Sequence, residues 1–220
     1  MLKKVFRSPI TTVVLVIAAA GLLFGGIIGG VRAAPLILSD NYIANLELAS
    51  IDIGLSENEI RVPNGGELLT SLVPEGESFH VGTVYDEALR VVNTGAITEY
   101  VRVTVYRYWT DSQGKAVNLD PSLIRLHFVE GNGWTIDQGA TTAERVVLYY
   151  SDPIAPGEST SPFTDTLAVS ADVNRAVTRL EDGSEDFDYN DVNFHIEAVA
   201  DAVQNHHAED AMTSAWGRTN

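Results

Sequence analysis

The sequence predicts an all-β protein, a jelly-roll-like β-sandwich that follows an N-terminal signal or anchor segment. Three observations predict it: a charge-free apolar run near the N-terminus, short stretches in which apolar and polar residues alternate, and turn residues between those stretches. The chain has 220 residues and no cysteine, so its fold depends on an apolar core and not on disulfide bonds. The chain that follows the apolar run is long enough to bury such a core.

Residues 1–33 have the composition of an export signal. Three basic residues stand within the first seven positions, residues 10–28 carry no charge, and small residues follow. We expect a signal peptidase to cut between Ala33 and Ala34, because the site needs small side chains. The apolar run is also long enough to nearly span a bilayer, so an uncleaved membrane anchor is the alternative. Contact with a membrane is expected only through this segment, before cleavage.

The part of the chain after the signal is strongly acidic. The whole chain has 30 acidic and 14 basic residues, and residues 1–33 hold four of the basic ones and no acidic one. The remainder therefore has 30 acidic against 10 basic residues, a formal net charge of −20. Such a surface repels nucleic acid and anionic lipid, so nucleic acid is not an expected partner.

Residues 46–204 read as a series of short strands. The clearest signal is at residues 100–108, where Val101, Val103 and Val105 alternate with polar side chains, as in a half-buried strand. Proline, glycine and asparagine turns separate the segments, and this spacing is typical of a sandwich or jelly roll. Comparable runs predict further strands at residues 46–55, 88–93, 123–129, 145–150, 163–169 and 192–199.

Two short helices are expected outside these strands. The first is predicted at residues 172–180, between two of the strands. The second is predicted at residues 208–216, within a polar C-terminal tail at residues 205–220.

Several short motifs follow one another in order along the chain. They are a glycine-rich junction at 29–34, Leu38-Ser39-Asp40, and the segments 49–56, 91–95, 100–103, 156–158 and 197–204. In this order they resemble the TasA/camelysin-like family, the secreted β-sandwich proteins of bacterial biofilm-matrix fibres. The chain departs from the family pattern by three extra residues at 35–37, and Leu38 stands where an aromatic residue is usual.

The resemblance implies a structural subunit of a fibre on the cell surface or in a biofilm matrix, with no enzymatic activity. Its partners would be other copies of itself, joined head to tail when the freed N-terminal segment, residues 34–45, donates a strand to the next subunit. The donor residues would be Ala34, Pro35, Leu36, Ile37 and Leu38.

The chemistry of this segment suits strand donation. Pro35 favours an extended chain, and an added strand supplies main-chain hydrogen bonds to its acceptor. Burial of Leu36, Ile37 and Leu38 is worth about 5 kcal/mol before ordering costs. The alternatives are that the segment pairs within its own domain or stays attached to the membrane.

Residues 181–191 are dense in carboxylate and amide oxygens. Alternating side chains at Asp186, Asp188 and Asn190 would point to one side of an extended loop, and hard oxygen ligands suit Ca²⁺. The segment also resembles the acidic loop of some secreted calcium-binding β-domains, whereas a solvated acidic loop is the alternative. Ca²⁺ is therefore the one expected cofactor, with these candidate ligands: Asp182, Glu185, Asp186, Asp188, Asn190 and Asp191.

No catalytic motif stands out in the sequence. The five histidines do not form a His-Glu-x-x-His zinc motif, and no Gly-x-Ser-x-Gly elbow is present. A secreted metallopeptidase remains the second hypothesis, because the camelysin name carries that activity. A monomeric, membrane-anchored calcium or glycan binder is the third, with Trp109, Trp134 and Trp216 as candidate sugar-stacking residues. Tryptophans are more often core residues.

Overall fold

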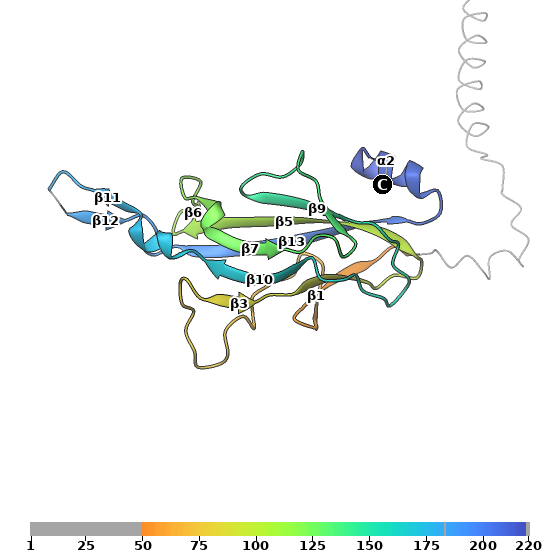
Figure 1. Cartoon of the computed structure of the whole chain (residues 1–220), viewed down its shortest axis with the longest axis horizontal. Coiled ribbons are helices and arrows are strands. Elements are labelled where there is room, and N and C mark those ends of the chain that lie inside the picture. The colour runs from red at the N-terminus through yellow and green to blue at the C-terminus, as the bar shows by residue number, and fades with distance from the viewer. Residues whose placement is uncertain (1–49, 183, 219–220) are drawn as a thin grey trace, which may run out of the picture. The chain divides into compact units, whose positions relative to one another are not determined.

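The computed structural model describes residues 50–182 and 184–218. This part is built from antiparallel sheets with one short α-helix, which confirms the expected all-β class (Figure 1). The predicted signal at 1–33, its cleavage site at Ala33 and Ala34, the donor residues 34–38 and the start of the strand expected at 46–55 lie outside the described residues.

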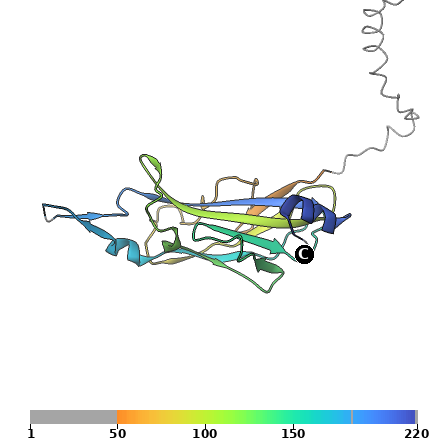
Figure 2. The same cartoon turned by 90° about the horizontal axis from the view of Figure 1, so that it is seen from above.

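The largest sheet has the strand order β13-β5-β9-β8. Its long strands are β5 (Glu99–Asp111) and β13 (Asn193–Gln204), which pair from Glu99 opposite Gln204 to Thr110 opposite Asn193. Figure 2 shows these two strands running beside each other from above. The shorter members are β9 (Arg145–Tyr150), β8 (Trp134–Ile136) and β6 (Gly114–Lys115), which pairs with the end of β5.

Two three-stranded sheets cover the other side of the core. One has the order β2-β1-β4, with β2 (Ile60–Val62), β1 (Ile53–Glu57) and β4 (Leu89–Asn93). The other has the order β3-β10-β7, with β3 (Val84–Asp86), β10 (Thr164–Val169) and β7 (Ile124–Phe128). The two sheets adjoin where β4 meets the chain leading into β10, because the Phe163 amide donates to the Leu89 carbonyl at 2.8 Å.

The core lies between the large sheet and these two smaller sheets. Alternation places Val101, Val103 and Val105 of β5 on the buried face, as period two requires. They belong to the same apolar cluster as Leu55 of β1 and Leu167 of β10.

The structure corrects the expected helix at residues 172–180. A 3-10 helix covers Ala171–Arg175, capped by the Ser170 side chain, and the chain then forms β11 (Val177–Arg179). That strand pairs with β12 (Glu185–Phe187) in a hairpin that projects from the rest of the domain (Figure 1).

The C-terminal helix is confirmed as α2 (Ala208–Trp216). It packs on the large sheet through buried Met212 and through Trp216, whose ring meets Tyr149 edge to face at 5.6 Å. Among the described residues, no helix has the length and apolar character that crossing a membrane requires.

Candidate functional site

Strand β13 forms an edge of the large sheet. Its only strand partner in the described part of the chain is β5. With 12 residues at about 3.3 Å each, it is a long strand for such a position. An open edge presents unpaired main-chain groups, which are a template for pairing with another chain.

The side chain of Asn64 shows which groups face outward from β13. Its Nδ2 donates to the Ala200 carbonyl at 2.8 Å, and the Ala200 amide donates to its Oδ1 at 2.9 Å. The main-chain groups of Ala200 therefore point away from β5. Antiparallel pairing alternates, so those of Phe194, Ile196 and Ala198 also point outward, and no described residue bonds to them.

A groove of about 730 Å³ runs beside this open edge. One wall is the first part of β13, from Asn193 to Glu197, and the other is the segment 65–73 together with Phe79. Apolar side chains on both walls line it: Leu68, Leu69, Leu72, Phe79, Phe194 and Ile196. The open main-chain edge is thus flanked by apolar surface.

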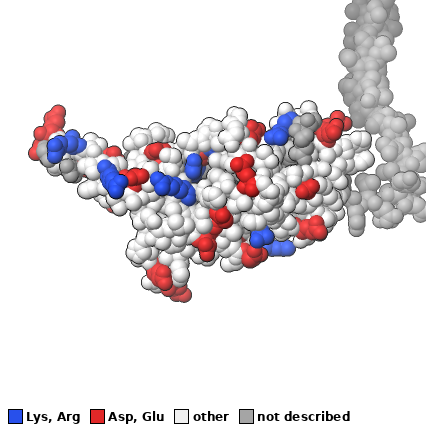
Figure 3. All heavy atoms as spheres, viewed as in Figure 1, with Lys and Arg blue, Asp and Glu red and all other residues white. Residues whose placement is uncertain are grey.

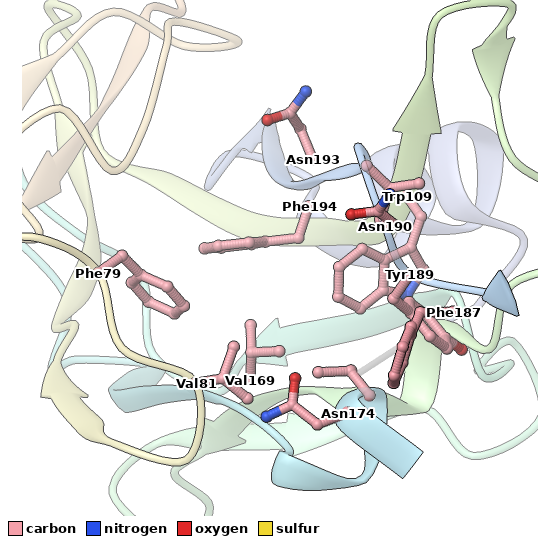
Figure 4. A pocket seen from close by; sticks show the side chains of 12 residues that line it. Phe79, Val81, Trp109, Val169, Asn174, Phe187, Tyr189, Asn190, Asn193 and Phe194 are labelled. Atoms are coloured by element: carbon pink, nitrogen blue, oxygen red, sulfur yellow. The ribbon is translucent and has the colours of Figure 1, made fainter. Parts of the chain in front are cut away.

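A second hollow of about 480 Å³ continues the groove, because both are lined by Phe79, Asn193 and Phe194. Figure 4 shows Phe79 and Phe194 across from each other, with Trp109 and Tyr189 at the far side. The Phe79 and Phe194 ring centroids lie 5.1 Å apart, and those of Trp109 and Tyr189 lie 4.9 Å apart. This end of the groove is aromatic.

The wall segment, residues 63–83, is fixed to the domain near its start, in its middle and near its end, where the His80 amide also donates to the Tyr85 hydroxyl at 2.7 Å. Asn64 bonds Ala200, the Leu69 amide donates to the Glu57 carboxylate, and the Gly82 amide donates to the Val169 carbonyl at 2.8 Å. The contact to Glu57 is the middle one, so it sets the position of the wall opposite β13.

The groove and the start of the described chain lie at opposite ends of β13. At one end the Ala96 amide donates to the Ser50 carbonyl. The Asn93 side chain nearby donates to the Ile154 carbonyl, and the Ile154 amide donates to the Glu99 carbonyl. Glu99 in turn pairs with Gln204, the last residue of β13. At the other end the groove begins at Asn193 and Phe194, which pairs with Trp109.

The acidic segment contributes to the hairpin and to a separate hollow. Four predicted ligands, Asp186, Asp188, Asn190 and Asp191, line one hollow of about 380 Å³. Asp182 lies in the hairpin turn instead. There the Ser184 hydroxyl and amide donate to it and lower its pKa. The side chain of Glu185 is outside the described set.

The hollow also includes Asp111 and Asn118, which the sequence analysis did not single out. They come from the chain around β6, far away in sequence, and no local pattern marks them. Asp188 already accepts a hydrogen bond from the Thr178 hydroxyl at 2.7 Å. Across residues 50–182 and 184–218, no three His, Asp or Glu side chains gather closely enough to form a metal cluster, so calcium binding stays a prediction.

The three tryptophans do not share a platform. Trp109 and Trp134 are buried in the core, whereas Trp216 packs against Tyr149. The indole nitrogens of the two buried residues donate to main-chain carbonyls, those of Asp120 and Ser161. These roles explain the tryptophans as structural residues.

Charged side chains of both signs are scattered over the face drawn in Figure 3. Several basic groups are paired with acidic ones, including Arg90 with Glu59 at 3.0 Å and Arg102 with Asp201 at 2.7 Å. This face carries no continuous basic surface.

No protein-family model matches the chain, and no curated protein matches it either. The resemblance to the TasA/camelysin-like family therefore stays a prediction.

Proposed function

We propose that this chain is an exported structural subunit that polymerises head to tail by N-terminal donor-strand addition, in an extracellular matrix or on the cell surface. Its domain would be a jelly-roll-like β-sandwich, and signal peptidase would cut between Ala33 and Ala34. The observation that carries the proposal is the open edge of β13 beside an apolar groove.

The donor and acceptor match in length and chemistry. Residues 34–38 are five apolar residues, and the outward-facing groups of β13 from Phe194 to Ala198 also span five residues, about 17 Å when extended. A strand added there gains main-chain hydrogen bonds from β13, while alternate side chains enter the groove. Leu72 and Phe79 of the wall offer apolar contacts to those side chains.

Asn64 caps this edge at Ala200, but the stretch before Ala200 has no cap of this kind among the described residues. Natural proteins commonly shield long edge strands with lysine, proline or a bulge. The acceptor stretch Phe194–Ala198 contains neither lysine nor proline, and its pairing with β5 has no break in register. An edge of this kind is suited to being covered by another strand.

The positions of the two ends favour a filament. Ser50, where the described chain begins, lies near one end of β13, and the groove begins at Asn193, at the other end. The donor segment precedes Ser50 in the sequence. A contact between two different surfaces of identical subunits adds one subunit after another. It produces an open filament unless the rotation between subunits closes the assembly into a ring. Strand donation would thus extend the assembly by one subunit at a time.

Deletion of residues 34–38 tests this proposal. We expect the shortened protein to keep its melting temperature, because the described sheets are complete without the segment, and to form no filaments in negative-stain micrographs. Ile37→Asp should act in the same way, since it places a charge in an apolar groove. Ser39→Asp, just outside the donor residues, is the matched control and should polymerise.

Two outcomes would contradict the proposal. Filaments of normal width and yield from the deletion variant would mean that assembly uses a lateral surface. Unfolding of the deletion variant would mean that the segment pairs within its own domain.

We also propose Ca²⁺ binding at the acidic hollow, as a secondary property. The supporting observation is that Asp186, Asp188, Asn190 and Asp191 line one hollow together with Asp111. Oxygen ligands of this kind suit Ca²⁺.

A further inference from the structure

Two glutamates are buried directly behind the groove wall. Glu57 ends β1 and is 2% exposed, and Glu87 precedes β4 and is fully buried. The Glu57 carboxylate accepts the Leu69 amide, and the Glu87 Oε2 accepts from Asn58 Nδ2 at 3.2 Å. The other Glu87 oxygen, Oε1, is buried with no hydrogen-bond partner among the described residues. Burial raises the pKa of Glu87, and the neighbouring Glu57 raises it further through a hydrogen bond and through its charge. We call Glu57 and Glu87 the carboxyl pair.

Within residues 50–182 and 184–218, no ion pair joins a basic side chain to the carboxyl pair. Of the neighbouring basic groups, Arg90 pairs with Glu59, and His127 pairs with Asp165. The titratable side chains on the surrounding elements are exposed or half-buried: Glu59, Arg61, Glu67, Tyr85, Asp86, Arg90, His127 and Asp165. Two adjacent buried carboxylates that lack a cation are too unfavourable to be ionised together, so one proton is held between them.

We propose that the carboxyl pair is a proton-operated latch on the wall of the groove. While the pair holds its proton, neutral Glu87 donates to Glu57, and the Glu57 carboxylate fixes the Leu69 amide. When the proton leaves, repulsion between the two charges drives them apart, and the middle anchor of the wall segment is lost.

The backbone at Leu69 is suited to such a release. Leu69 has φ +67°, a left-handed conformation that is uncommon for a residue with a branched side chain. The hydrogen bond from the Leu69 amide to Glu57 holds Leu69 in this conformation. Once that hydrogen bond is lost, the segment relaxes to a more favourable backbone conformation. The anchors at Asn64, His80 and Gly82 remain, so the change is confined to the wall between Asn64 and His80.

The range of the switch follows from the surroundings of Glu87. Burial, followed by the hydrogen bond and the charge of Glu57, raises the pKa of Glu87 to about 8, against a smaller opposing effect of Asn58. The latch is therefore closed in acid and neutral solution and opens in mildly alkaline solution. That it controls strand acceptance rests on the proposed function, whereas the latch itself is a property of one subunit.

The test is an NMR titration of the mature protein from pH 5.5 to 9.5, at a concentration where it is monomeric. We expect one glutamate carboxyl to titrate near pH 8, with the Leu69 amide signal moving at the same midpoint. Limited proteolysis within residues 65–79 should increase across that range. In Glu87→Gln, whose neutral amide still donates to Glu57, both changes should disappear. Exposed Glu67→Gln is the matched control and should keep both.

Three results would overturn the latch. They are the same transition in Glu87→Gln, titration of both glutamates near pH 4.5, and loss of the transition in the Glu67→Gln control. A fourth measurement separates the latch from the proposed function. If the latch titrates as expected while filament growth is equal at pH 6.5 and pH 9, its link to strand acceptance is wrong and the latch stands.

Discussion

A few buried polar residues organise the end of the domain where the described chain begins. Asn93 is fully buried, and its Nδ2 donates to the carbonyls of Ile97 and Ile154, while its Oδ1 accepts the Gly95 amide. Gly95 lies so close to the entering chain that an added Cβ would be 2.6 Å from the Ser50 carbonyl oxygen. The Asn93-Thr94-Gly95 turn, one of the motifs of the family resemblance, therefore has a structural role: it fixes where the chain enters the sheet.

Two buried carboxyl groups make stability depend on pH. Burial is the main cause that raises the pKa of Glu87 to about 8. Burial also raises the pKa of Glu99 to about 7, and the nearby charge of Asp52 raises it further. In the unfolded chain both groups titrate near 4.5. Each group binds its proton more tightly in the folded protein, so its stabilising contribution is complete below about pH 4.5 and is lost as the pH rises to 7 and 8.

We therefore expect the free energy of unfolding, measured by urea denaturation, to decrease from pH 5 to pH 8. The slope should approach about 1.4 kcal/mol per pH unit for each proton involved. The double variant Glu87→Gln and Glu99→Gln should flatten the profile, whereas exposed Glu75→Gln should leave it unchanged. A profile that rises over this window would show that the carboxyl groups are already ionised in the folded chain.

At the scale of elements, sequence periodicity predicted the long strands and missed the short ones. The alternation in β5 and β13 extends over enough residues to define a buried face, so both were predicted; β5 extends beyond both predicted ends, and β13 extends beyond its predicted C-terminal end. Strands such as β2, β3 and β8 have three residues each, too few to display a period. The β11–β12 hairpin was not predicted, because its many charged residues are typical of a solvated acidic loop. In the structure, Val177 of β11 pairs with Phe187 of β12.

The groove was not predictable because it depends on contacts between distant residues. The order of strands leaves β13 at an edge, and a single sequence does not determine that order. The wall segment reaches β13 through Asn64, which is 136 residues away from Ala200. The apolar segment proposed as donor is visible in the sequence, whereas the groove proposed to accept it is visible only in the structure.

Calcium binding at the acidic hollow can be tested through protein stability. We expect millimolar Ca²⁺ to raise the melting temperature, because a ligand that binds only the folded state stabilises it, by about 2.7 kcal/mol at 100 times its dissociation constant. Asp188→Asn combined with Asp191→Asn should remove the increase. An equal increase in the double variant would indicate general screening of the acidic surface instead of a site.

At the scale of the whole molecule, the proposed subunit has one donor segment and one acceptor groove; the described chain begins near one end of β13, and the groove begins at the other. The open edge from Phe194 to Ala198 and the apolar wall opposite are both features of the single subunit, present before any partner arrives. Assembly would therefore need little rearrangement beyond the ordering of the donor. If strand donation joins the subunits as proposed, the donor of each subunit would be used by the next, and a filament would have a free groove at one end and a free donor at the other.

The absence of cysteine allows a direct test of this contact. Two differently tagged proteins are prepared, one with Ile37→Cys in the donor and one with Thr70→Cys in the groove wall, and they are mixed under oxidising conditions. Because each protein has a single cysteine, a disulfide that joins both tags can form only between subunits. Thr135→Cys, exposed on β8 at the opposite edge of the same sheet, replaces Thr70→Cys in the control. Donor-strand addition predicts a mixed-tag disulfide with Thr70→Cys and little with Thr135→Cys. Equal yields at the two positions, or none at Thr70→Cys from a sample that forms filaments, would contradict it.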